Sequence, residues 1–150
     1  MWDEITAAAS AESALWAEAL RPVAEQEREP VFSSLAPPEH ALGIETIYEG
    51  YLVHFGRSRL FGPEDADTAL LLGDYLYAHG LVHIAQSGDV KAVADLAELI
   101  SRCSQLRADG LDGDGQAWVA TSSSLGNGAA PGSDEDAVAL ALAAHARLVG

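Results

Sequence analysis

The sequence contains little cysteine, little positive charge and no long apolar run. Its 150 residues include one cysteine, Cys103, which excludes an internal disulfide and favours a reducing compartment. Eight basic residues stand against 23 acidic ones, and the formal net charge of -15 makes the surface repel nucleic-acid phosphates and anionic lipids. No apolar stretch approaches the ~20 residues that a membrane span requires. We therefore expect neither a nucleic-acid partner nor a transmembrane segment.

The first residues and the overall composition suggest where the protein is found. Asp3 and Glu4 make the start of the sequence acidic, whereas a secretory signal peptide begins with basic residues, so we expect a cytoplasmic protein. A single lysine, Lys91, beside many Ala, Gly, Asp and Arg residues suggests a bacterium with a GC-rich genome. A chain of 150 residues fits one domain, which we expect to comprise residues 1–150.

Apolar residues recur at intervals of three and four along almost the whole chain, which predicts α-helices rather than strands. Pro22 either kinks the first helix or opens a short second one towards Arg28. Gly62-Pro63 and Gly88-Asp89 separate the later helices, with Asp89 as an N-cap. We predict an all-α bundle of about six helices, which cover approximately residues 3–20, 22–28, 39–57, 63–86, 89–109 and 134–148.

Residues 110–133 differ in composition from the rest of the chain. They are rich in Gly, Ser and Asp, and such a segment buries too little apolar surface to offset the entropy of ordering it. We expect a mobile loop here, before the C-terminal helix. In the helix that precedes it, Cys103 shares an apolar stripe with Leu96 and Ile100, so we expect an inert, buried thiol.

Acidic residues cluster at two places where carboxylate chemistry is conceivable. Glu45 and Glu49 lie one helical turn apart, a spacing that acid–base catalysis can use, but a solvated pair is the plainer interpretation. The run from Asp109 to Gly115 lacks carboxylates at the first and last positions of a calcium loop. We therefore expect both groups to be solvated.

Residues 44–106 contain several short sequence motifs that follow one another in a set order. A helix pattern that reads approximately E-L-I-H-x-A-S-L-I-H-D-D-x-x-D is matched at Glu45, Ile47, Leu52, Val53 and His54. A later G-D-Y-L pattern is matched by Gly73-Asp74-Tyr75-Leu76, and a following turn and helix end by Gly88-Asp89 and Ser104-Gln105. With these motifs the region resembles the trans-type polyprenyl diphosphate synthases. The resemblance implies a reduced terpenoid-synthase-like helical fold.

The chain departs from this family where the family performs its chemistry. The aspartates that bind Mg²⁺ in the family correspond to Phe55, Gly56 and Arg59 here. None of these side chains is a hard oxygen ligand, so we expect no cofactor and no catalysis of the family type.

The resemblance implies instead a non-catalytic protein of isoprenoid biosynthesis that works through helix–helix association. It would form a homodimer, or a heteromer in which it is the accessory or regulatory subunit of a catalytic prenyl diphosphate synthase. In the family the G-D-Y-L helix builds much of the dimer interface. The implied interface residues are therefore Gly73, Asp74, Tyr77, His79 and His83.

Two alternative functions remain open. The first is a module that binds a small apolar, isoprenoid-like ligand, with the candidate pocket residues Tyr48, Tyr51, His54, Phe55 and Tyr75. The second is a metal-dependent enzyme, because His79 and His83 are four residues apart on one helix face. Its third ligand would come from His54 or Asp74. Partly buried or interface histidines are the plainer interpretation of this pair.

Overall fold

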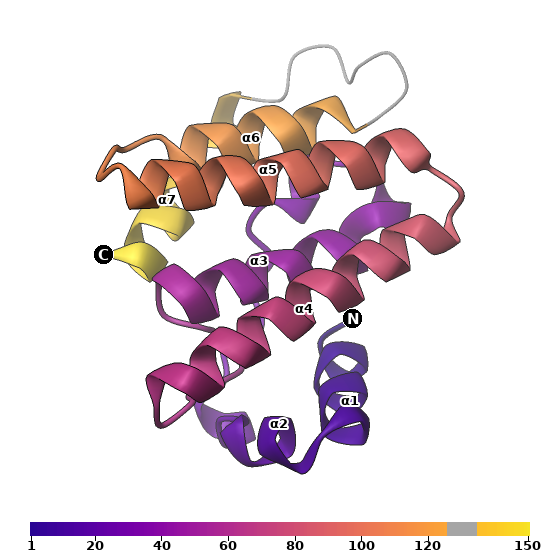
Figure 1. Cartoon of the computed structure of the whole chain (residues 1–150). Helices are drawn as coiled ribbons and strands as arrows, with labels where there is room; N and C mark the ends of the chain where they lie inside the picture. Colours follow the sequence, from indigo (N-terminus) through magenta and orange to yellow (C-terminus); the bar gives the residue numbers. More distant parts are fainter. Residues whose placement is uncertain (126–134) are drawn as a thin grey trace.

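The described part of the chain folds into seven α-helices, which lie against one another in a bundle (Figure 1). The structure, a computed structural model, describes residues 1–125 and 135–150. Within these ranges the only β-type pairing is an isolated bridge between Leu20 and Phe61, and the predicted all-α bundle is confirmed. The helices are α1 (Trp2–Glu12), α2 (Ala14–Ala19), α3 (Ala41–Phe55), α4 (Ala66–Gln86), α5 (Val90–Ala108), α6 (Asp114–Ser124) and α7 (Glu135–Val149), with 3₁₀ turns at Val23–Glu25, Ser33–Leu35 and Pro38–His40.

Side-chain caps fix where the two longest helices begin. Asp65 accepts a hydrogen bond from the backbone N–H of Thr68 at 2.7 Å and opens α4. Asp89 accepts one from the N–H of Ala92 at 2.9 Å and opens α5, as predicted. The second carboxylate oxygen of Asp89 lies 3.0 Å from Nε2 of His40, so this residue also joins α5 to the turn before α3.

The N-terminal segment is more broken than the sequence predicts. Residues 3–20, expected as one helix, lie in α1 and α2, with Ser13 in an extended conformation between them. The hydroxyl of Ser13 accepts a hydrogen bond from the N–H of Leu15 at 3.1 Å and caps α2, which explains the interruption. Beyond Pro22 the chain makes one 3₁₀ turn and then continues in an extended conformation, so the expected helix towards Arg28 does not form.

Helices α3 and α4 pack very closely against each other and run in opposite directions (Figure 1). Gly43 lies opposite Gly80, and Gly50 lies opposite Gly73, and the two glycines of each helix are seven positions apart in the sequence. A Cβ atom on Gly80 would lie 2.9 Å from the carbonyl oxygen of Gly43, and one on Gly50 would lie 2.8 Å from that of Gly73. Because a side chain would push the backbones apart, this crossing requires glycine on both helices.

The buried apolar side chains form two clusters. The larger one packs α3 against α5, α6, α7 and the segment 31–35, and it includes the aromatic residues Phe32, Tyr48, Tyr51 and Trp118. The smaller one joins α1 and α2 to α4 and to the segment 60–61. Cys103 lies in the larger cluster, where burial raises the pKa of its thiol to about 12, so the prediction of a buried thiol is confirmed. Among the described helices, none is both long and apolar enough to cross a bilayer.

Part of the segment expected to be a mobile loop is helical. Residues Asp114–Ser124 form α6, and Gly113 turns the chain into it with a φ of 126°. The ring of Trp118 is 1% exposed and stacks on Phe32 with ring centroids 5.4 Å apart. With the buried Ala117 and Leu125, this ring supplies apolar surface that the Gly- and Ser-rich composition does not suggest. Residues 126–133 of the expected loop lie outside the described residues.

Candidate functional site

Arg59 lies inside the molecule between two carboxylates. Its Nε is 2.6 Å from Oε1 of Glu49 and its Nη1 is 2.8 Å from Oε2 of Glu45, and the three side chains are at most 1% exposed. The rings of Trp2 and Tyr48 have their centroids 4.8 and 5.1 Å from the guanidinium carbon. Burial disfavours the charge of Arg59, but Glu49 and Glu45 raise its pKa above the usual value, so it stays protonated.

The same carboxylates bind backbone groups on both sides of α3. Oε1 of Glu45 accepts hydrogen bonds from the N–H groups of Val31 and Ser33 at 2.9 and 3.0 Å. Oε1 of Glu49 accepts one from the N–H of Arg59 at 3.2 Å. The prediction that Glu45 and Glu49 are solvated is therefore wrong, because their helix face is covered by the segments before and after α3. The pair holds both segments against the helix.

A second buried network connects α3 with the start of α6. Oδ2 of Asp114 accepts hydrogen bonds from Nε of Arg107 at 2.7 Å and from the hydroxyl of Tyr51, while Nη2 of Arg107 donates to the Tyr51 oxygen at 2.8 Å. Asp114 is 5% exposed, so the expectation of a solvated acid is wrong at this position. Burial and the bond to Asp114 raise the pKa of Tyr51, and its hydroxyl keeps its proton at neutral pH.

Tyr48 forms the third polar contact in this part of the core. Its hydroxyl oxygen lies 2.9 Å from Nδ1 of His145 on α7. The rings of Phe32 and Trp118 pack edge-on against Tyr48 with centroids 5.0 Å from its own. Burial raises the pKa of Tyr48 and lowers that of His145, so both side chains are neutral at pH 7.

The structure separates the five residues predicted to line one apolar pocket. Tyr48 and Tyr51 are inside the core, on the side of α3 that faces α6 and α7. His54 and Phe55 border a surface groove at the end of α3. Tyr75 lies elsewhere on α4, where its ring stacks against His79 with centroids 5.4 Å apart.

The groove beside His54 and Phe55 has a largely apolar lining. It has a volume of about 670 Å³ and lies between the end of α3, the first turns of α4 and the middle of α5. Leu70 and Ile100 contribute to its walls. Tyr77 also lines it, and within the described residues the buried hydroxyl of this tyrosine has no hydrogen-bond partner.

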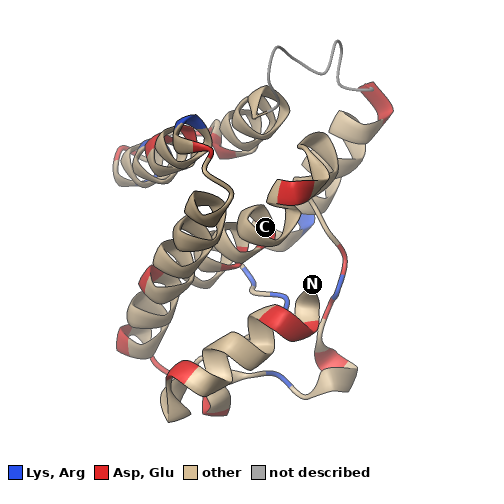
Figure 2. Cartoon of the chain, turned by 90° about the vertical axis from the view of Figure 1, so that its right-hand side faces the viewer, with Lys and Arg blue, Asp and Glu red and all other residues tan. Residues whose placement is uncertain are grey.

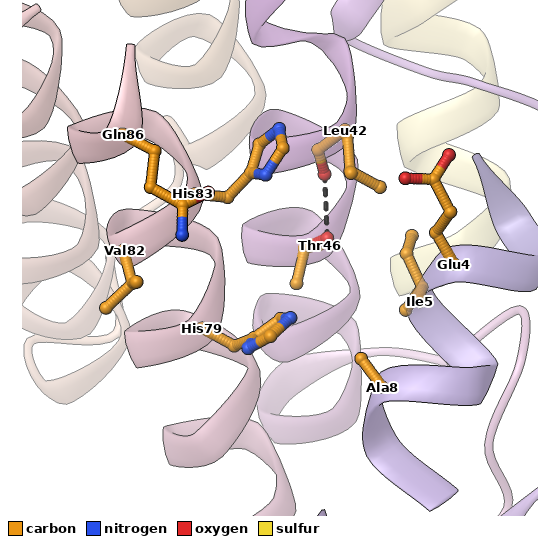
Figure 3. Close-up of a pocket in the computed structure, with 9 residues that line it drawn as sticks. All are labelled: Glu4, Ile5, Ala8, Leu42, Thr46, His79, Val82, His83 and Gln86. Atoms are coloured by element: carbon orange, nitrogen blue, oxygen red, sulfur yellow. Dashed lines mark hydrogen bonds between the residues drawn. The ribbon is translucent and has the colours of Figure 1, made fainter. Parts of the chain in front are cut away.

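A smaller pocket of about 230 Å³ contains the histidine pair and is shown in Figure 3. His79 and His83 extend from α4, Glu4 comes from α1, and Thr46 lies on α3 with its hydroxyl donating to the carbonyl oxygen of Leu42 at 2.7 Å. Among the described residues, no group of three or more His, Cys, Asp and Glu side chains could hold a metal ion.

The two residues expected as a third metal ligand pair with each other instead. Nε2 of His54 lies 3.4 Å from Oδ1 of Asp74 and 3.0 Å from the carbonyl oxygen of Leu70. Both His54 and Asp74 line the apolar groove, whereas His79 and His83 line the smaller pocket.

The residues implied as an interface also divide into two sets. Gly73 and Tyr77 are buried within the chain, where Gly73 packs against α3 and cannot contact a partner. Asp74 and His79 are exposed on α4, and His83 is half-buried. The surface available for association on this helix is therefore its outward side.

Sequence reasoning missed Arg107 and Asp114, which complete the second network, and His145, which contacts Tyr48. A signal for His145 exists, because Ala141, His145 and Leu148 follow the spacing of a buried helix face.

Comparison of the chain with protein-family models, curated proteins and solved structures finds no match.

Proposed function

We propose that this protein is a non-catalytic helical protein that works by associating with another polypeptide through the outward face of α4. The observation that carries the proposal is an exposed apolar stripe on this helix. Leu71 and Val82 are each 56% exposed, and the exposed Ala78 and Ala85 lie on the same side. Leu71, Ala78 and Ala85 are seven residues apart, the spacing with which helices pack along one another.

The charge around the stripe favours a partner with basic residues. Exposed Asp67 and Asp74 flank it, and the whole chain carries a net charge of -15. Figure 2 shows acidic positions spread over the helices and few basic ones. Since a second copy of the chain brings the same negative charge, a heteromer with a basic-flanked helix is favoured over a homodimer.

The positions that carry metal-binding aspartates in the resembled family support a role without catalysis. Phe55 and Gly56 offer no ligand, and the charge of Arg59 is engaged by Glu45 and Glu49 in the core. The resemblance makes a catalytic prenyl diphosphate synthase the proposed partner, with this chain as its accessory subunit.

Purification of the tagged chain from its native cells tests the association. We expect the wild type to retain a stoichiometric protein with intact aspartate-rich motifs, and the Leu71→Glu/Val82→Glu variant to lose it, because the variant places unpaired carboxylates in the contact. Leu140→Glu is the matched control, since Leu140 is 73% exposed on α7 and outside the stripe. The proposal fails if the wild type is recovered alone as a monomer, or if the double variant keeps the partner.

A second candidate function is the binding of a small apolar, isoprenoid-like ligand in the groove beside His54 and Phe55. Its volume of about 670 Å³ lies in the range of small-molecule sites, ~300–1,000 Å³. The unpaired hydroxyl of Tyr77 and the carboxylate of Asp74 would orient a terminal polar group, while Leu70 and Ile100 contact the chain of the ligand.

Binding of farnesol, measured by calorimetry, tests this candidate. Ser104→Phe introduces a ring at the wall of the groove and should weaken binding by at least about tenfold, the effect of losing ~1.4 kcal/mol of contact. Ser101→Phe, an exposed position one turn earlier on α5, should bind like the wild type. Equal affinity of the wild type and Ser104→Phe, or no binding at all, would count against a ligand in this groove.

A further inference from the structure

A groove that is separate from the α4 stripe lies over the Tyr51–Asp114–Arg107 network. It has a volume of about 600 Å³ and runs between the α5–α6 connection and the last turns of α7. Leu111, Leu142 and Val149 provide apolar wall, while His145 and Arg107 bring polar groups to the same space. Its size and its mixture of apolar wall with few polar groups are those of a small-molecule site.

His145 presents one ring nitrogen to this groove. Its Nδ1 is bound by Tyr48 in the core, so Nε2, on the other side of the ring, faces outward towards the first turn of α6. The side chain is 7% exposed, and Nε2 has no hydrogen-bond partner among the described residues. If the Tyr48 oxygen accepted a hydrogen bond from Nδ1–H, the hydroxyl proton of Tyr48 would have no partner in the core. The Tyr48 hydroxyl therefore donates to Nδ1, and the hydrogen of the neutral imidazole ring is on Nε2.

The first turn of α6 adds further donors beside His145. This helix has 11 residues and begins after Gly113, which has no side chain with which to cap it. The backbone N–H groups of Gly115 and Gln116 precede the first intrahelical hydrogen bonds and are available to a ligand. Gly115 lines the groove next to His145, so ring and backbone donors converge on one space.

The charges decide what kind of acceptor this space favours. The guanidinium of Arg107 is neutralised by Asp114 at 2.7 Å, and the exposed Asp112 adds a negative charge at the rim. The groove thus offers hydrogen-bond donors without net positive charge. We propose that it binds an uncharged small molecule through a carbonyl oxygen, which accepts from Nε2–H of His145 and from the first-turn N–H groups of α6, while the apolar part of the ligand contacts Leu142 and Val149.

Titration of the full chain with N,N-dimethylbenzamide and with benzoate, followed by NMR, tests this proposal. We expect the amide to shift the signals of Nε2 of His145 and of the Gly115 and Gln116 amides saturably, and benzoate to bind at least about tenfold more weakly. Benzoate binding as tightly as the amide would overturn the proposal, and so would the absence of saturable shifts at these three groups.

Two variants separate ligand contact from folding. Tyr48→Phe/His145→Phe removes both partners of the internal bond while keeping two aromatic rings, and it should weaken the amide about tenfold through the lost donor. Gly115→Ala places a Cβ atom 3.0 Å from Cδ2 of His145 and 3.1 Å from Cδ2 of Leu142, which narrows the groove within a helix that tolerates alanine. Ala120→Gly, exposed on the same helix, is the control and should bind normally. Unchanged affinity in both folded variants would overturn the proposal.

Discussion

Replacing Arg59 with methionine should lower the free energy of unfolding by about 3–5 kcal/mol, the cost of leaving buried carboxylates without their cation. Methionine fills much of the same volume, but Glu45 and Glu49 are both 0% exposed and would face each other with no compensating charge. Urea unfolding followed by circular dichroism measures the loss. The effect is large because two charges are stranded at once.

Arg57 provides the matched control for this experiment. It lies two residues earlier, is 50% exposed and pairs with Glu27 at the surface. Arg57→Met should change the stability by less than about 1 kcal/mol, since solvent screens an exposed pair. Similar losses for Arg57→Met and Arg59→Met would contradict the account of Arg59 as the cation of a buried cluster.

Gly80→Ala should lower the free energy of unfolding by about 1–3 kcal/mol, the range observed when a packed core is overfilled. The new Cβ atom would lie 2.5 Å from Cγ1 of Ile47 and 2.9 Å from the carbonyl oxygen of Gly43, so α3 and α4 would have to separate. Alanine favours a helix over glycine by about 1 kcal/mol, so helix propensity alone would predict a gain in stability. The close crossing reverses that sign, and we expect a loss. Thermal and urea unfolding measure the change.

Ala78→Gly, on the exposed side of α4, measures the effect of helix propensity on stability without any change at the crossing. It should cost about 1 kcal/mol and leave the crossing intact. A Gly80→Ala protein as stable as the wild type would mean that the two helices can move apart without cost, and the close crossing would then have no role in stability.

Much of the fold could be predicted because its helices follow local rules. The apolar period and the cap at Asp89 place α5 to within a residue or two, and the start of α4 differs from the prediction by three residues. The break at Ser13 was missed because a hydroxyl cap inside an Ala-rich stretch competes weakly with helix propensity in a sequence pattern. Helix α6 was missed because its order depends on contacts with residues far away in the chain, such as the stacking of Trp118 on Phe32 and the bond between Asp114 and Tyr51.

The buried networks could not be predicted in the same way. The spacing of Glu45 and Glu49 gives a helix face but does not indicate whether the face is covered, and the covering segment 31–33 has no periodicity of its own. The position of Arg107 near Asp114 in sequence is visible, whereas their contact with Tyr51 depends on tertiary packing. Whether a charged side chain is buried depends on which segments cover it in the folded chain, and the sequence around that residue does not show this.

The Glu45–Arg59–Glu49 cluster has a consequence for how the chain folds. Its cation follows α3 by a few residues, and the N–H groups that complete it precede α3 by about ten, so the helix alone carries two carboxylates without their counter-charge. A partly folded form with only one flanking segment docked would still contain a carboxylate without all of its partners, which is unfavourable. The cluster thereby makes the docking of both segments cooperative and disfavours partly unfolded forms in which α3 is exposed on one side.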